Sequence, residues 1–280
     1  MTGTLFVVAT PIGNMGDMTL RAIETLRTCD GVVAEDTRRT RGLLSHLGIV
    51  GKPLDALHAH SEARDVARVA ARVVDGESIA LVTDAGTPVV SDPGEALVRA
   101  VLDAGARVVP IPGASAVLAA LVASGLSADG RFRFLGFLPR DGTGRREAIA
   151  LACETPEPVV LFEAANRTTK TLAELADATP GRPACVAREL TKVHEELVRG
   201  TLLELAGDPR EWMGEVVLVL GAHAPTDRVA AIDDAAIDTR IDAELAAGGH
   251  AKGIAERLAA WSGRPKRAVY ERVLGRKRGG

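Results

Sequence analysis

The sequence has few aromatic residues and few cysteines, and it has no apolar run long enough to cross a membrane. Phe, Trp and Tyr make up 3% of the 280 residues, so aliphatic side chains must fill most of any core. Cys29, Cys153 and Cys185 are far apart and form no CxxC pair, which is typical of a reducing compartment and argues against a structural zinc site. Apolar runs such as 79–82 and 216–220 are only as long as strands. We find no signal peptide and expect a cytoplasmic protein.

Two common phosphate-binding patterns are missing as well. There is no GK[ST] P-loop, and the first glycine-containing turn does not have the GxGxxG spacing, which makes a dinucleotide oxidoreductase a weak candidate. The net charge of −3 argues against a general nucleic-acid coat protein. The charge is unevenly distributed, however, because residues 263–280 hold seven Arg and Lys residues against Glu271 alone. On charge alone, this basic end is interpreted as a solvated tail.

Strands alternate with helices in the first part of the chain. Strands are predicted at 5–9, 32–35, 79–83 and 107–111, and helices at 19–27, 37–47, 61–75, 92–104 and after Ser115. For the helix at 92–104, the pattern predicts Asp92 as N-cap, Pro93 at the first helical position and Glu95 as an acid in the first turn. This alternation predicts an α/β fold with a mainly parallel sheet and helices on both faces.

The second part has more closely spaced strands and fewer helices. Strands are predicted at 132–137, 159–163, 183–189, 195–199 and 215–220, with a helix at 166–176. This spacing favours a mixed sheet. Short helices are predicted at 234–246, 251–261 and 266–274. We therefore expect an N-terminal α/β lobe at 1–117, a C-terminal α/β lobe at 118–222 and a small, basic helical extension at 223–280.

Three loops follow strands of the first sheet and contain glycine. The turn at 9–17 includes Pro11, Gly13 and Asn14, the loop at 83–94 is long and carries two acids, and the turn at 112–115 opens a helix. Ligands of open α/β sheets bind beyond the carboxyl ends of the strands, and a helix N-terminus can bind a carboxylate or a phosphate. Each loop alone could be an ordinary connection or cap, but together they indicate a binding edge.

Two further polar clusters lie at predicted strand ends. Residues 35–41 (EDTRRTR) combine acids with arginines on the first helical turns, where the helix dipole does not favour cations. Phosphate recognition would explain them, and so would a weak surface ion pair. Residues 188–196 (RELTKVHEE) form a second cluster, or simply a hairpin loop. His58 and His60 have no third ligand nearby, so we expect no metal site.

These segments together resemble the tetrapyrrole methylase superfamily. TPIGN, DAGTPVVSDPG and PGAS match it in order and context across nearly all of residues 1–222. Within the superfamily, AEDTRRTRGLL, FLGFLPR and ARELTKVHEE are similar to the branch that methylates the 2′-oxygen of a cytidine in 16S ribosomal RNA. The resemblance implies a two-lobed class III methyltransferase fold, a homodimer, and S-adenosylmethionine as the methyl donor between the lobes.

The resemblance also implies roles for particular residues. The expected cofactor-binding residues are Pro11, Gly13, Asn14, Asp84, Ala85, Gly86, Thr87, Ser115, Glu163, Ala164, Asn166 and Gly221. In the second lobe, backbone atoms would flank the adenine. We expect Asp36 or Glu189 as the general base, with Arg38 and Arg188 positioning phosphates or offsetting charge, unless alignment alone suffices. The expected RNA-binding residues are Arg38, Arg39, Arg41, Lys192, Arg264, Lys266 and Arg267.

Two alternatives remain open. The same fold could methylate a tetrapyrrole or another small acceptor, because fold alone does not determine function. The chain could also be a ribosome-assembly factor that binds the small subunit without catalysis. The EDTRRTR segment and the basic end weigh against the first alternative, and the intact glycines of the three loops weigh against the second.

Overall fold

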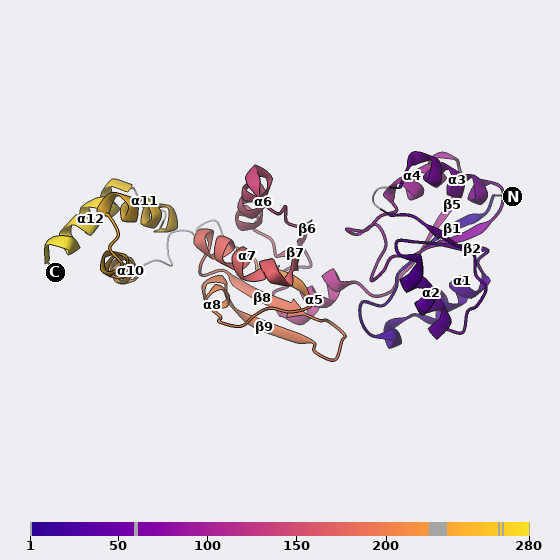
Figure 1. The fold of residues 1–280 in the computed structure, drawn as a ribbon, viewed down its shortest axis with the longest axis horizontal. Coiled ribbons are helices and arrows are strands. Elements are labelled where there is room, and N and C mark those ends of the chain that lie inside the picture. The colour runs from indigo at the N-terminus through magenta and orange to yellow at the C-terminus, as the bar shows by residue number, and fades with distance from the viewer. Residues whose placement is uncertain (1, 59–60, 224–233, 263, 265, 280) are drawn as a thin grey trace. The chain divides into compact units, whose positions relative to one another are not determined.

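The computed structural model describes residues 2–58, 61–223, 234–262, 264 and 266–279 (Figure 1). The chain forms two compact units. The first unit consists of Met1–Ala123 and Arg188–Glu196, and the second of Ser124–Ala187 and Leu197–Gly280. The first unit thus extends beyond the predicted boundary at 117 and includes a distant segment of the chain. The division into 1–117, 118–222 and 223–280 stays a prediction.

The first unit is built on a five-stranded parallel sheet with the strand order β3-β2-β4-β1-β5. The strands are β1 Thr4–Val8, β2 Gly31–Ala34, β3 Leu54–Ala56, β4 Ser78–Leu81 and β5 Arg107–Ile111. The register pairs Thr4 of β1 with Ser78 of β4 and with Arg107 of β5, so β1 lies between β4 and β5. The parallel sheet is confirmed, and β3 is an edge strand that the sequence pattern did not predict.

Helices cover both faces of this sheet. They are α1 Leu20–Thr28, α2 Thr37–His46, α3 Ala63–Val74 and α4 Glu95–Asp103. The apolar residues of α1 and α2 pack on one face, with Leu26 and Leu44 in that core, and those of α3 and α4 on the other, with Val73 and Leu97. The strands are therefore buried on both sides, as near-continuous runs of Val, Ile, Leu and Ala require.

The start of α4 differs from the prediction. Asp92 is not the N-cap, because the cap residue is Gly94, with φ at 128° and no side-chain hydrogen bond to the helix. Val89 and Ser91 have positive φ values of 74° and 67°, so the loop turns sharply before it reaches the helix. A Cβ at position 94 would lie 2.7 Å from Cδ2 of Leu81, which requires glycine there. The Asp92 carboxyl is left to face the strand ends.

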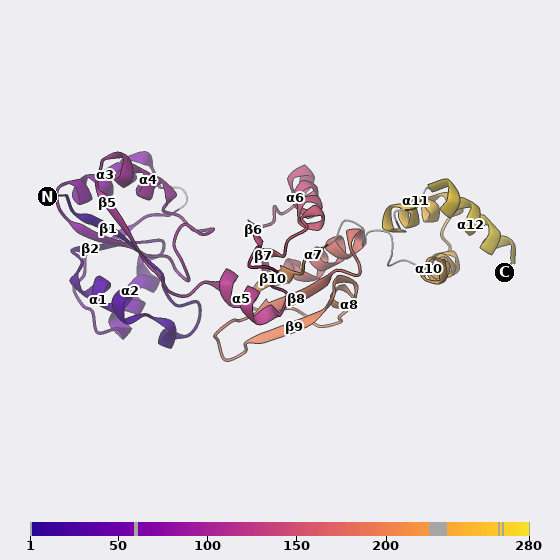
Figure 2. The same ribbon diagram turned by 180° about the vertical axis from the view of Figure 1, so that it is seen from behind.

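The second unit holds a mixed five-stranded sheet with the order β6-β7-β10-β8-β9. The strands are β6 Arg133–Phe137, β7 Val159–Ala164, β8 Pro183–Arg188, β9 Glu196–Thr201 and β10 Glu215–Leu220. β7 runs parallel to β6 and antiparallel to β10, which confirms the predicted mixed sheet. β9 forms one edge of the sheet (Figure 2).

Four helices lie in or next to this second part of the chain. They are α5 Ala116–Ser124, α6 Gly142–Glu154, α7 Ala165–Ala178 and α8 Leu202–Ala206. α6 and α8 were not predicted. α6 begins among glycines and lacks a clear apolar stripe, whereas α8 is a single short turn held by a capping box between Thr201 and Glu204. Leu172 and Leu175 of α7 pack with Leu161 and Leu218 in one core.

The predicted C-terminal helices are confirmed. They are α10 Asp234–Ala246, α11 Ala251–Ser262 and α12 Lys266–Gly279, and they pack around a core of their own (Figures 1 and 2). Ile241, Leu258 and Val273 are among its fully buried residues. Among the described residues, no helix combines the length and the apolar character needed to span a membrane.

Candidate active site

The three glycine-containing loops of the first unit meet at one edge of its sheet. β4, β1 and β5 are neighbours, so their carboxyl ends lie side by side. The Thr10 amide donates to the Gly86 carbonyl at 2.8 Å, and the Gly86 amide donates back to the Thr10 carbonyl at 3.1 Å. The Thr87 hydroxyl donates to the Ala114 carbonyl at 3.1 Å. Backbone contacts thus join the first loop to the second and the second to the third.

Two glycines of these loops are required by the geometry. Gly86 has a φ of 86°, which L side chains rarely adopt. At Gly113, an added Cβ would lie 2.9 Å from the Cβ of Ala9, which is too close for either backbone to keep its position. These two glycines let the three loops converge closely, with Gly86 buried among them and Gly113 exposed.

Ser115 lies immediately before α5, where the sequence predicted an anion-binding turn. Its carbonyl accepts from the Ala119 amide at 2.9 Å, and its hydroxyl accepts a long hydrogen bond from the Leu118 amide at 3.4 Å. A weak cap of this kind is easily exchanged for a ligand. The helix N-terminus behind it favours a negative group.

The segment at 188–196 also belongs to the first unit and contacts the first loop. The Asn14 amide donates to the Thr191 hydroxyl at 3.0 Å. An added Cβ at Gly13 would lie only 2.4 Å from Cγ of Lys192, so the two segments touch closely. Glu189 and Thr191 have positive φ values of 50° and 65°, and Lys192 pairs with Glu189 at 2.9 Å. The structure therefore brings the second polar cluster to the predicted binding edge.

Asp84 stands at the end of β4 and connects two of the predicted groups. Its Oδ1 accepts from the Asp36 amide at 3.1 Å, and its Oδ2 pairs with Arg39 at 3.4 Å. The Asp84 side chain is 23% exposed, while that of Arg39 is 68% exposed. A carboxylate oxygen can accept more than one hydrogen bond, so Asp84 can still bind a ligand hydroxyl.

Asp36 pairs with Arg38, as the surface-pair alternative allowed, and it also has a structural role that the sequence interpretation did not foresee. It is the N-cap of α2, and its side chain accepts from the Arg38 amide at 2.8 Å and from the Arg38 guanidinium at 3.2 and 2.8 Å. The hydrogen bonds from Arg38 lower the pKa of Asp36 to about 2. A carboxylate with so low a pKa is a weak base at neutral pH. Its predicted role as general base stays a prediction.

Asp92 is a functional candidate that the sequence interpretation missed, because it was assigned as a helix cap. It faces Thr83, whose hydroxyl donates to Oε2 of Glu35 at 3.1 Å. Burial raises the pKa of Asp92 to about 6, and the negative charges of Glu35 and Asp84 contribute to the rise. The positive φ values of Val89 and Ser91, which turn the loop before Asp92, are visible in the structure but leave no signal in the sequence. Asp92 is thus a carboxyl group whose protonation changes near neutral pH.

The predicted cofactor residues of the second unit have mainly structural partners. The buried Glu163 carboxylate contacts Arg145 at 3.7 Å and Arg167 at 2.5 Å, and it accepts from the Thr171 hydroxyl at 2.6 Å. This leaves only its backbone for a ligand, as the prediction requires. Nearby, Ala164 is the N-cap residue of α7, and Asn166 is exposed in the first turn.

Gly221 follows β10, and both of its backbone polar groups have partners within the second unit. Its amide donates to the Pro183 carbonyl at 2.7 Å, and its carbonyl accepts from Nε of Arg182 at 2.8 Å. A carbonyl can accept a second hydrogen bond. The predicted contact of Gly221 with the adenine stays a prediction.

The predicted RNA-binding cations fall into two regions. In the first unit, Arg38, Arg39 and Arg41 are exposed on α2. In the C-terminal helices, Arg264 pairs with Asp234, Lys266 pairs with Glu256 at 2.9 Å, and Arg267 pairs with Glu271 at 3.0 Å. The basic end is therefore not a bare tail, because carboxylates of the same helices neutralise much of its charge. The remaining predicted RNA-binding residue, Lys192, lies in the first unit and pairs with Glu189 at 2.9 Å. Arg188, predicted to position phosphates, pairs with Glu196 at 3.2 Å.

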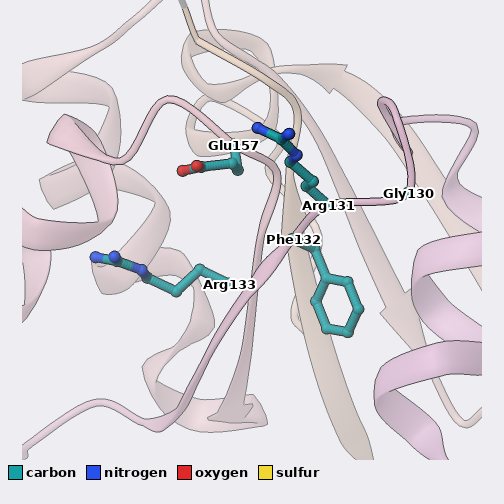
Figure 3. Close-up of a pocket in the computed structure, with 5 residues that line it drawn as sticks. All are labelled: Gly130, Arg131, Phe132, Arg133 and Glu157. Carbon is teal, nitrogen blue, oxygen red and sulfur yellow. The ribbon is translucent and has the colours of Figure 1, made fainter.

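A cavity of about 370 Å³ opens in the second unit, and none of the predicted site residues lines it. It is lined by Gly130, Arg131, Phe132, Arg133 and Glu157 (Figure 3). Arg131 and Arg133 extend on the side of Glu157, whereas the Phe132 ring points to the other side of the segment (Figure 3). Since no carboxyl strand end or glycine loop contributes to it, this cavity is not the candidate active site.

Within the described part of the chain, no three His, Cys, Asp or Glu side chains are grouped so that they could hold a metal ion. His58 is exposed, and its amide donates to the Ser61 hydroxyl at 2.9 Å. His60, the other member of the histidine pair, lies outside the described residues.

Comparison with known sequences adds a family to this geometry. The family described as "Tetrapyrrole (Corrin/Porphyrin) Methylases" matches residues 4–206. A protein of Xylella fastidiosa named "Ribosomal RNA small subunit methyltransferase I" is 44% identical over 96% of this chain and 98% of its own length. Proteins of the same name from Micromonospora olivasterospora and Halalkalibacterium halodurans are 40% and 38% identical, over 97% and 96% of this chain and 87% and 93% of their own.

Comparison with solved structures supports the fold. The structure of a diphthine synthase covers 79% of this chain and 92% of its own, with a TM-score of 0.60 and 19% identity. A uroporphyrin-III C-methyltransferase of Thermus thermophilus, solved in complex with S-adenosylhomocysteine, covers 78% of this chain and 97% of its own, with a TM-score of 0.55 and 19% identity. At this level of identity the similarity concerns the fold alone.

Proposed function

This chain belongs to the tetrapyrrole (corrin/porphyrin) methylase family, and its relatives include proteins named ribosomal RNA small subunit methyltransferase I. We therefore propose that it methylates 16S ribosomal RNA. The reaction is transfer of the methyl group of S-adenosylmethionine to the 2′-oxygen of a cytidine ribose. The observation that carries this proposal is the match to relatives of that name over nearly the whole chain at about the same length.

The edge of the first sheet fits the methyl donor. The donor carries ribose hydroxyls, a cationic sulfur and ammonium group, and a carboxylate. Asp84 would accept from a hydroxyl, the backbone of Ala85–Thr87 would line the ribose and methionine parts, and the turn at Ser115 would bind the carboxylate. The close convergence of the loops at Gly86 and Gly113 supports this fit, because a side chain at either position would strain the loops. Pro11, Gly13 and Asn14 would form the wall behind the donor.

When bound, the donor supplies a methyl group already activated by its positively charged sulfur. The chain must then hold the ribose oxygen in line with that methyl group and exclude water. Alignment of this kind can lower a barrier by on the order of 7–11 kcal/mol at best. Removal of the hydroxyl proton by a base adds roughly 10²–10⁴-fold in rate.

Of the two carboxylates predicted as base, Glu189 is better suited than Asp36. The pKa of Asp36 is about 2 and its oxygens cap α2, whereas Glu189 lies in the segment that packs against Gly13. The Glu189 carboxylate is paired with Lys192. To act as the base, it would leave Lys192 and accept the proton of the ribose hydroxyl. Arg38 and Arg188 would position the phosphates of the RNA.

A homodimer and a cytoplasmic location belong to the same proposal and rest on the resemblance to the family. Light scattering of the purified protein would test the dimer directly. A mass of about one chain at micromolar concentration would remove that part of the proposal without affecting the proposed chemistry.

A tritium-transfer assay tests the proposed reaction. Purified protein and labelled S-adenosylmethionine are mixed with 30S subunits, naked 16S RNA or a tetrapyrrole, and the labelled RNA is mapped. We expect label on a cytidine 2′-oxygen. Label on the tetrapyrrole alone would show that the acceptor is a small molecule. Cofactor binding without transfer to any acceptor would favour a ribosome-assembly factor.

Two variants test the base in the same assay. Glu189→Gln should lower turnover by roughly 10²-fold or more if the carboxylate removes the proton. Asp36→Asn should leave turnover close to that of the wild type. If Glu189→Gln also transfers methyl at the wild-type rate, positioning alone is sufficient and no dedicated base is needed at this site.

A further inference from the structure

Four cations of α12, namely Arg267, Arg272, Arg276 and Lys277, divide into two sets that face different surroundings, and Lys266 at the start of the helix pairs with Glu256 of α11. Arg272 pairs with Asp234 at 2.9 Å and with Asp238 at 2.6 Å, and Arg276 pairs with Asp238 at 3.3 Å and with Asp242. The aspartates raise the pKa of Arg272. All three acids lie on α10, so this inward set joins α12 to α10 and is neutralised by it.

The other set lies on the opposite side of α12 and has no such partners. Arg267, Tyr270, Leu274 and Lys277 follow one another at helical spacing, and together we call them the outer face. The side chains of Arg267, Tyr270 and Lys277 are exposed. Lys277 has no carboxylate partner among the described residues, and the Arg267–Glu271 pair is an exposed one of little energetic worth.

Tyr270 makes this face chemically specific. It is the only tyrosine of the chain, it is 38% exposed, and it lies between two cations on a helix. An exposed aromatic ring flanked by cations fits unpaired nucleic acid, because a base can stack on the ring while the cations bind phosphates. Arg267 and Lys277 are about 15 Å apart along the helix, a distance that several nucleotides of an extended strand can follow.

We propose that the outer face of α12 binds an unpaired segment of RNA, with Tyr270 stacked on a base and with Arg267 and Lys277 on phosphates to either side. This inference rests on the proposed function only in its choice of ribosomal RNA as the physiological partner. Within α12, it assigns RNA binding to the outer face, whereas Arg272 and Arg276, the inward set, join α12 to α10.

Fluorescence anisotropy of a short labelled single-stranded RNA tests the outer face in the full-length protein. Tyr270→Ala should weaken binding at least about fivefold without changing the salt dependence, while Tyr270→Phe should bind within about twofold of the wild type. Arg267→Gln and Lys277→Gln should each reduce the slope of log K against log salt by about 0.7. Lys252→Gln, the same charge change on α11, should alter neither quantity.

Folding of each variant can be followed separately. Trp261 lies within these helices, 4.5 Å from the guanidinium of Arg240, so in a Trp212→Phe background its emission reports their packing. Variants of the outer face should keep the wild-type emission. An affinity loss that came with altered Trp261 emission in Tyr270→Ala, but not in Tyr270→Phe, would mean that the ring is structural and would overturn the stacking role.

Three further results would overturn the proposal. The first is an RNA affinity of Tyr270→Ala equal to that of the wild type. The second is a loss of RNA affinity in Lys252→Gln as large as in the outer-face variants. The third is a protein that does not bind the RNA but binds 30S subunits through Arg267 and Lys277. The last result would identify an acidic protein surface as the partner. Failure of the proposed function gives a different result. If the protein transfers no methyl group but binds RNA through Tyr270, this inference stands and the proposed reaction is wrong.

Discussion

Charged side chains are used differently at the edge of the first sheet and in the interior of the second unit. In the second unit, Arg182 is buried and donates to the carbonyls of Ala152, Thr155, Glu157 and Gly221. The buried Glu163 is likewise surrounded by partners. At the edge of the first sheet, Asp84 and Asp92 are only half-buried.

This difference separates charges that hold the fold from charges that can serve a ligand. A fully buried ion must be satisfied by the protein, because leaving it unpaired costs several kcal/mol. A half-buried carboxylate at a strand end keeps contact with solvent and can exchange its partners. The candidate site therefore lies in the region where the fold leaves polar groups incompletely enclosed.

Removal of a buried cation from the second unit should have the largest effect. Arg182→Met leaves four buried carbonyls without this donor, so we expect the free energy of unfolding to fall by about 3 kcal/mol or more. Urea denaturation measures this loss. Lys170→Met, which removes an exposed partner of Glu174, is the control and should cost less than about 0.5 kcal/mol. Equal losses in both variants would contradict the distinction.

A methyl group at the first-sheet edge should have the next largest effect. Gly113→Ala forces apart the backbones at Ala9 and Gly113, and we expect it to lower the free energy of unfolding by about 1–3 kcal/mol and to weaken S-adenosylmethionine binding. Calorimetry with the cofactor and urea denaturation measure the two effects. Gly42→Ala, in α2 with open space around it, should be neutral or stabilising. If Gly113→Ala bound S-adenosylmethionine with the wild-type affinity, Gly113 would not be part of the cofactor site.

Asp92 should make stability depend on pH near neutrality. Its pKa in the folded protein is about 6, above the ordinary value of 3.8, so its contribution to stability is present below about pH 4 and is lost as pH rises through 6. Asp92→Asn should therefore be more stable than the wild type at pH 7.5, by about 1–2 kcal/mol after allowance for solvent screening. The difference should vanish near pH 4. A difference independent of pH would show that the carboxyl is not shifted.

Asp36 should give the smallest effect, with the opposite sign. Its pKa is lowered to about 2, so its contribution is present above 3.8 and is lost only as pH falls through 2. Asp36→Asn should have nearly the wild-type urea midpoint at pH 7, because Asn caps helices as well as Asp. Asp36→Ala, which loses the cap, should have a lower midpoint. Equal midpoints for the two variants would mean that the cap contributes nothing.

Local patterns predicted most of the first unit and less of the second. The strands and helices of the first unit follow from alternating apolar runs, and Thr19, where the predicted helix 19–27 begins, caps α1. The short strand β3, the helix α6 and the single turn α8 were missed because none of them has a strong periodic pattern. The start of α4 was misplaced because two residues with positive φ, Val89 and Ser91, shift the cap from Asp92 to Gly94.

The sequence by itself determined the family of this protein and predicted its candidate binding edge, because TPIGN, DAGTPVVSDPG and PGAS are contiguous segments whose glycines and strand-end positions can be read locally. Only the tertiary structure decided what each charged group does. Arg272 meets Asp238 across 34 positions of the chain, and Asn14 meets Thr191 across 177. Burial and pairing depend on such distant neighbours, so the raised pKa of Asp92 and the different surroundings of the two sides of α12 follow from packing, whereas Asp36 is held by Arg38, two residues further along the chain.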